Sequence, residues 1–134
     1  MSIDISRFDK CRILVVGDLM IDEYVWGQVD RISPEAPVQI VSVKSEGFTL
    51  GGAGNVVNNL VALGAQAAAV GVTGAGRNGK LLLEKLKEIG VNTQGVTQEA
   101  GRPTTRKTRI IAANQHVLRI DKEVKKEISD RSFE

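Results

Sequence analysis

Short apolar runs alternate with helical patterns along much of this chain. Residues 12–18 form a β-branched run, Arg-Ile-Leu-Val-Val-Gly-Asp, which is typical of a strand buried on both faces of a parallel sheet. Between Asn55 and Leu63 the apolar residues follow helical spacing, and Gly64 provides a natural end to that helix. The next apolar run, at 67–72, predicts a second buried strand.

A second amphipathic helix is predicted after the turn at 73–76. Leu82, Leu86 and Ile89 fall on one face of it, and Gly90 ends it. The order strand, helix, strand, helix indicates βαβ units on a parallel sheet. We therefore expect an α/β fold with flanking helices.

Two stretches, 23–45 and 104–121, do not follow this order. Each contains two short apolar runs around a turn, which predicts antiparallel strands. We expect them to form a small subsidiary sheet beside a core made of residues 10–22 and 51–100.

Composition narrows the class of protein. The chain has 134 residues, 42% of them hydrophobic and 25% charged, with a net charge of +2, as expected for one globular domain without a nucleic-acid or membrane partner. Its single cysteine, Cys11, and the absence of an apolar N-terminal segment favour the cytoplasm.

Near the end, Ser129 or Asp130 could cap a helix whose first apolar residue is Phe133. One turn does not repay helix nucleation, so we expect a truncated domain.

The glycine-rich segment Gly51-Gly52-Ala53-Gly54-Asn55 opens the first predicted helix. Glycines allow the backbone to approach a ligand, and a helix N-terminus offers free N–H groups. A plain strand-to-helix turn is the alternative. The segment has neither the spacing of a dinucleotide fingerprint nor the Gly-Lys-Ser/Thr end of a Walker A loop.

Two carboxylates, Asp18 and Asp22, follow the first predicted strand. Ligands of open α/β sheets lie at the carboxyl ends of the strands, where a carboxylate can accept hydrogen bonds from sugar hydroxyls. The alternative is that Asp18 caps a turn and Asp22 lies at an exposed strand end.

Taken together, these motifs resemble the N-terminal region of bacterial heptose 7-phosphate kinases. These are ribokinase-like, PfkB-type sugar kinases, often fused to an adenylyltransferase. The Gly-Gly-Ala-x-Asn element is shared across the superfamily, whereas Arg-Ile-Ser-Pro-Glu-Ala-Pro at 31–37 points to the heptose branch. The resemblance covers nearly the whole chain and rests on Gly17-Asp18-x-Met20-x-Asp22, 31–38, 51–56, Thr73-Gly74, Lys107-x-Arg109 and 118–121.

The resemblance implies a ribokinase-like core with a small antiparallel β lid, formed by the strands at about 23–45 and 104–121, that closes over the sugar and mediates a homodimer. It implies that the sugar-phosphate substrate is bound by Asp22, Gly51, Gly52 and Asn55. Lys107 and Arg109 share one face of a predicted lid strand, where they either hold the substrate's phosphate or form a solvated face. ATP and Mg²⁺ are the implied cofactors, with sites mostly outside this chain.

The sequence also departs from the family pattern. The Gly-Ala-Gly-Asp motif that carries the family's base is absent, and Thr73-Gly74-Ala75-Gly76 is followed by Arg77 instead. His116, the one histidine, sits near a predicted hairpin turn and is expected to be solvated. We therefore assign no catalytic residue or metal ligand and expect the chain alone to be inactive. The alternatives are another ribokinase-like sugar kinase and a non-catalytic sugar-binding or dimerisation module.

Overall fold

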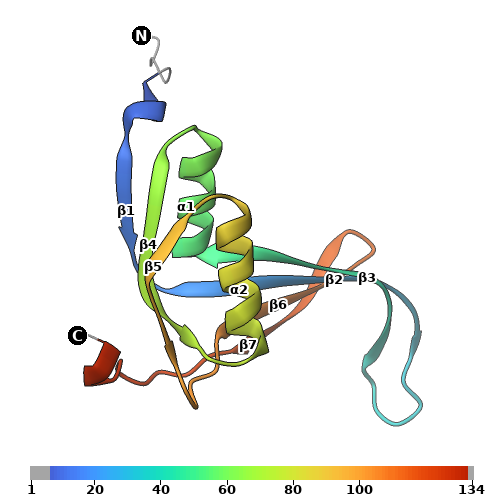
Figure 1. Ribbon diagram of the computed structural model, residues 1–134. Helices are drawn as coiled ribbons and strands as arrows, with labels where there is room; N and C mark the ends of the chain where they lie inside the picture. Colours follow the sequence, from blue (N-terminus) through green and yellow to red (C-terminus); the bar gives the residue numbers. More distant parts are fainter. Residues whose placement is uncertain (1–6, 133–134) are drawn as a thin grey trace.

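The computed structural model describes residues 7–132 and contains two sheets. Sheet A is parallel, with strand order β1-β4-β5, and sheet B has the order β3-β2-β6-β7. Sheet B extends away from the core as a long ribbon (Figure 1). The elements are η1 Phe8–Lys10, β1 Arg12–Val16, β2 Leu19–Ile32, β3 Gln39–Gly52, α1 Ala53–Ala62, β4 Gln66–Gly74, α2 Arg77–Glu88, β5 Asn92–Glu99, β6 Thr105–Ala112, β7 Gln115–Lys122 and η2 Asp130–Ser132.

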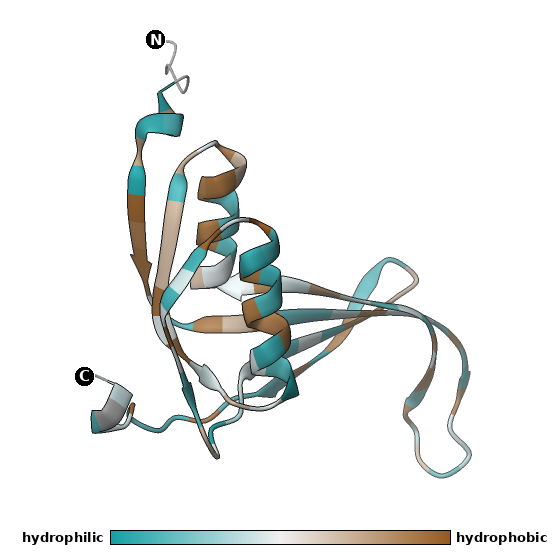
Figure 2. Cartoon of the chain, in the orientation of Figure 1, coloured by the Kyte–Doolittle hydropathy of each residue, from teal (hydrophilic) through white to brown (hydrophobic). Residues whose placement is uncertain are grey.

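The predicted α/β order is confirmed, and both helices end at the expected glycines. Gly64 and Gly90 follow α1 and α2 with φ of 95° and 78°, a left-handed conformation that glycine adopts without strain. Both helices have an apolar and a polar side (Figure 2). The strand β5 was not predicted, because Asn-Thr-Gln-Gly-Val-Thr-Gln-Glu has no apolar run.

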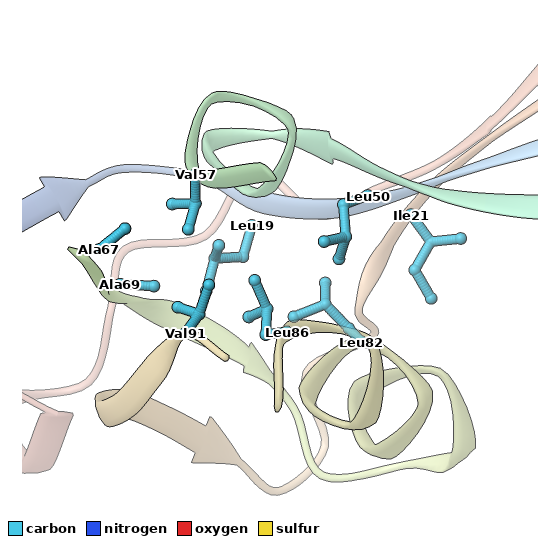
Figure 3. Packing of buried hydrophobic residues seen from close by; sticks show 9 residues of the cluster. All are labelled: Leu19, Ile21, Leu50, Val57, Ala67, Ala69, Leu82, Leu86 and Val91. Carbon is cyan, nitrogen blue, oxygen red and sulfur yellow. The ribbon is translucent and has the colours of Figure 1, made fainter. Parts of the chain in front are cut away.

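The core lies where α1 and α2 meet both sheets (Figure 3). Ile21 of β2 and Leu82 and Leu86 of α2 are fully buried. Burying a Leu or Ile side chain stabilises the fold by about 1.5–3 kcal/mol. The same cluster therefore fixes the helices on sheet A and the base of sheet B. Its buried members are Leu19, Ile21, Leu50, Val57, Ala67, Ala69, Leu82, Leu86 and Val91.

The prediction that the first strand is buried on both faces is wrong for β1. Leu14 and Val16 are 62% and 70% exposed, whereas Val15 packs against the core. The helices α1 and α2 cover only one side of sheet A (Figure 1). The residues of β1 therefore alternate between a covered side and an open side.

The lid is a mixed sheet. β2 pairs with β3 and β6 pairs with β7 in antiparallel fashion, as predicted, but β2 and β6 are parallel neighbours. The β6–β7 loop consists of Ala113 and Asn114, both with positive φ, as in a type I′ turn. β2 and β3 continue from the core into the lid without a break, so core and lid share the same strands.

Candidate functional site

The alternation of side chains divides sheet B into two faces. We call the side that carries Asp22 and Tyr24 of β2 the front face, and the side that carries Ile21 and Glu23 the rear face. Ile21 belongs to the core, so the rear face turns toward the helices at the base of the sheet. The parallel register sets Asp22 beside Lys107 and Tyr24 beside Arg109 of β6, which confirms that Lys107 and Arg109 share a face.

Asp22 lies on the front face close to the backbone of Gly51. A Cβ added at Gly51 would lie 2.7 Å from Asp22 Oδ2 and 2.9 Å from Met20 Cγ. Gly51 is buried and pairs directly with Met20 across the β2–β3 ladder. The glycine is therefore required because the Asp22 carboxylate occupies the space of a side chain.

Arg109 binds the other carboxylate oxygen of Asp22. Its Nη1 donates a hydrogen bond to Asp22 Oδ1 at 2.5 Å, and its guanidinium carbon lies 5.4 Å from the centre of the Tyr24 ring. The hydrogen bond with Asp22 raises the pKa of Arg109 above its ordinary value, against the effect of partial burial. Tyr24 stacks in turn on Trp26, with ring centres 5.5 Å apart. The front face thus holds a preorganised carboxylate–guanidinium pair.

Lys107 lies between carboxylates of β7 and the segment after it. Its Nζ is 3.3 Å from Asp121 Oδ2 and 3.7 Å from Glu123 Oε2. Arg119 also binds Asp121, and these hydrogen bonds, first from Arg119 and then from Lys107, hold the pKa of Asp121 below its ordinary value. Both predicted phosphate-binding cations therefore already have carboxylate partners.

A cleft of about 920 Å³ opens at the carboxyl ends of the strands of sheet A. It is lined by strand ends of sheet A, by the start of β2 and β6, and by the segment 123–128. Of the predicted site residues only Lys107 lines it, although Asp18 does so as well. The front face adjoins the cleft, because Met20, Thr105 and Lys107 line the cleft and fall on the front face in the register.

Gly52 and Asn55 lie where β3 becomes α1. The predicted turn is a direct transition, in which Gly52 has φ +55° and the Ala53 N–H donates a hydrogen bond to the Asp18 carbonyl at 2.9 Å. A Cβ at Gly52 would overlap that carbonyl oxygen. Asn55 is exposed in the first turn of α1. The structure therefore places the glycines beside Asp18 and Asp22, with Asn55 one turn away.

Thr73 and Gly74, predicted as part of a turn, are instead the last residues of β4 and have a packing role. Thr73 is buried, its hydroxyl lies 3.0 Å from the Thr104 hydroxyl, and the Gly74 N–H donates to the same Thr104 oxygen. Gly79 of α2 packs against the Gly74 carbonyl, where a Cβ would overlap it. His116 is exposed on β7, as expected.

A polar cluster around Glu99 was not predicted from the sequence. Its carboxylate accepts hydrogen bonds from Arg102 Nε at 2.6 Å, from the backbone N and hydroxyl of Ser129, and from Ser132 Oγ. Arg102 also donates to the carbonyls of Lys126 and Glu127. These bonds, that from Arg102 above all, lower the pKa of Glu99 to about 2. The cluster holds the segment 123–132 along the cleft.

No helix in the described range 7–132 is long and apolar enough to cross a membrane. The same residues contain no group of three or more His, Cys, Asp or Glu side chains suited to a metal ion.

Comparison with known proteins gives relatives along nearly the whole chain. A protein of Desulfatibacillum aliphaticivorans named Bifunctional protein HldE is 62% identical over 133 residues, which are 99% of this chain and 27% of that protein. Its namesake in Sulfurimonas denitrificans is 58% identical, covering 92% of this chain and 26% of its own length. The chain thus spans about a quarter of the length of these curated relatives.

Solved structures share the fold. Ribokinase of Arabidopsis thaliana, complexed with ribose and ATP, has a TM-score of 0.66 at 24% identity, over 83% of this chain and 35% of that one. A Cryptococcus neoformans ribokinase in complex with ADP has a TM-score of 0.61 at 25% identity, over 84% and 34%. These likenesses confirm the predicted ribokinase-like fold. The model of the pfkB family carbohydrate kinases matches residues 10–134, and the chain belongs to this family.

Proposed function

We propose that this chain forms the sugar-phosphate-binding part of a kinase that phosphorylates D-glycero-D-manno-heptose 7-phosphate at its anomeric hydroxyl. The product is the 1,7-bisphosphate, an intermediate of ADP-heptose and lipopolysaccharide core synthesis. The motif at 31–37 and the relatives at 62% and 58% identity support the heptose branch. The word "bifunctional" in their names agrees with the expected fusion to an adenylyltransferase.

The observation that carries this proposal is the arrangement of Asp22 against Gly51. An ionised carboxylate accepts hydrogen bonds only, and sugar hydroxyls donate them. Gly51 leaves room for this carboxylate beside the backbone of β3, which holds it at the base of the front face. Asn55, with an amide that both donates and accepts, would bind a further hydroxyl from the start of α1.

Arg109 and Lys107 supply positive charge for the phosphate that the substrate already carries. They are two residues apart on β6, so their side chains start about 7 Å apart on one face. Arg109 is the better candidate for a phosphate contact, since a guanidinium can bind Asp22 and a phosphate through different N–H groups. Lys107 would have to exchange Asp121 or Glu123 for the substrate.

ATP would supply the transferred phosphoryl group, and Mg²⁺ would neutralise charge on it. The residues described offer no fitting group of metal ligands, so we assign no Mg²⁺ contact to them. Within this chain the proposed task is to bind and orient the sugar phosphate beside the cleft.

We also propose a homodimer that forms through the lid, in the cytoplasm. The lid strands expose apolar side chains away from the core, among them Trp26 at 40% and Val43 at 52%. Exposed apolar residues on sheet strands favour association with a second surface. Further exposed apolar residues are Ile32, Leu118 and Ile120 of the same strands and Val38 of the β2–β3 loop.

The test is a chimaera in which the 133 matching residues of this chain replace the corresponding part of the Desulfatibacillum relative. We expect ATP-dependent phosphorylation of heptose 7-phosphate, with kcat/KM at least about a hundredfold above that for the unphosphorylated heptose, since two charge-assisted contacts are lost. Equal turnover of both sugars, or preference for ribose, would refute the proposed substrate.

A further inference from the structure

Directly behind Asp22, on the rear face of β2, lies a buried acid. Glu23 is only 8% exposed, and its Oε2 accepts a hydrogen bond from the hydroxyl of Thr108, which is equally buried. Nε of Arg106 lies 3.5 Å from the same oxygen and is itself buried without a hydrogen-bond partner. Among the described residues, Glu23 is the one acid or base in the buried class.

The buried Glu23 carboxylate is not expected to increase the stability of the fold. Removing a carboxylate from water costs more than its ion pair returns unless the geometry is excellent, and an apolar residue of similar volume is often as stable or more so. The pair with Arg106 is loose, because 3.5 Å is beyond a good charge-assisted hydrogen bond. The close contact is the one with Thr108, its direct partner across the β2–β6 ladder.

The charged side chains alone do not determine the register of β2 on β6. β2 carries the neighbouring acids Asp22 and Glu23, whereas β6 carries cations on both faces, Arg106 behind and Lys107 and Arg109 in front. A shift of one residue would turn every β6 side chain to the other face and still leave acids beside cations. Buried Ala112 and the bonds of Thr104 to Thr73 and Gly74 also favour the observed register, and the Thr108 hydroxyl adds to them because it meets Glu23 only there.

We propose that Glu23 and Thr108 are positioning residues for the sugar-phosphate site. Their buried hydrogen bond helps to fix the register of β2 on β6 and thereby to place Arg109 against Asp22 on the opposite face. Neither residue touches the substrate in this arrangement. The inference rests on the proposed function, in which Asp22 and Arg109 bind the sugar phosphate.

Three variants of the chimaera test the inference. Thr108→Val keeps the shape and removes the hydroxyl, Glu23→Leu removes the acceptor, and Glu23→Gln keeps an oxygen that can accept from Thr108. We expect the first two to raise KM for heptose 7-phosphate by about fivefold or more, with kcat within about twofold. Both should lower the melting temperature, because each leaves a buried polar partner unsatisfied. Glu23→Gln should restore KM to within about twofold of the parent. Thr93→Val on β5 of sheet A is the matched control and should leave KM unchanged.

A second readout needs no substrate. In the 134-residue chain, nuclear Overhauser effects between Asp22 and Lys107 report the register, and the Arg109 side-chain resonances report its bond to Asp22. Thr108→Val should weaken the Overhauser effects and shift the Arg109 resonances, whereas Thr93→Val should change neither of these signals. Unchanged signals in Thr108→Val overturn the inference, as does an unchanged KM in both disruptive variants or an equal loss in Glu23→Gln. Failure of the parent chimaera to use heptose 7-phosphate would instead refute the proposed function, and the resonance test would stand.

Discussion

Replacing Gly51 by alanine tests whether the Asp22 carboxylate is part of a sugar site. The added methyl would lie 2.7 Å from Asp22 Oδ2 and 2.9 Å from Met20 Cγ, well inside contact distance. Gly51 does not have a positive φ, so the substitution acts by steric contact and not by backbone strain. Because Oδ1 is held by Arg109 at 2.5 Å, the carboxylate must rotate or break that bond to make room.

The expected loss follows from the hydrogen bonds that Asp22 would make. A hydrogen bond to a charged group contributes about 1.5–3 kcal/mol, so a displaced carboxylate should weaken sugar-phosphate binding roughly tenfold to hundredfold. Overpacking should lower the free energy of unfolding by about 1–3 kcal/mol. Isothermal titration with heptose 7-phosphate measures the affinity, and thermal unfolding measures the change in stability.

Gly76→Ala provides the matched control. A Cβ at Gly76 meets nothing within 4 Å, and its φ of −78° suits any residue. Sugar affinity of this variant should stay within about twofold, as for other surface changes. If Gly51→Ala binds heptose 7-phosphate as tightly as Gly76→Ala, the Asp22 carboxylate is not part of the sugar site.

Three further predictions concern the same surface and its surroundings. Asp22→Asn in the chimaera should reduce kcat/KM for the sugar roughly tenfold to hundredfold, while KM for ATP stays nearly constant. Asn55→Ala should have the same effect more mildly, because a neutral hydrogen bond is weaker. A change confined to the melting temperature of Asp22→Asn would instead make Asp22 a structural cap. Glu99, whose pKa is lowered to about 2 by its hydrogen-bond donors, stabilises the fold above its ordinary pKa of 4.5, and this contribution is lost as the pH falls from 4.5 toward 2. Glu99→Gln should therefore make the melting temperature, measured by circular dichroism, less dependent on pH between pH 5 and 3. An unchanged dependence would exclude Glu99 as the cause of the loss of stability at low pH. Finally, Trp26→Ser should shift the sedimentation of a lid-mediated dimer toward the monomer, whereas a parent chain that sediments as a monomer at high concentration would contradict the dimer.

The parts of the fold with strong local patterns were predictable from sequence. Helical spacing placed α1 and α2, and the glycines at 64 and 90 marked their ends. In contrast, β5 has a polar sequence and is a strand because it pairs with β4, which is a tertiary effect. The parallel pairing of β2 and β6 likewise joins segments that no local pattern connects.

The candidate site was predicted in part, for a similar reason. Alternation along β6 was enough to place Lys107 and Arg109 on one face. The contact between Asp22 and Arg109 could not be predicted, because the residues are separated by 87 positions and meet only in one register. The Glu99 cluster was missed because its donors, such as Ser129, come from a segment without regular structure.

The most direct test of the central claim is a resonance titration of the isotope-labelled 134-residue chain with D-glycero-D-manno-heptose 7-phosphate. If Asp22 and Arg109 bind the sugar phosphate, the amides of Asp22 and Gly51 and the Arg109 side chain should show saturable shifts, with smaller shifts for the heptose that lacks the phosphate. Shifts confined to other surfaces, or equal responses to both sugars, would contradict a sugar-phosphate site on the front face of sheet B.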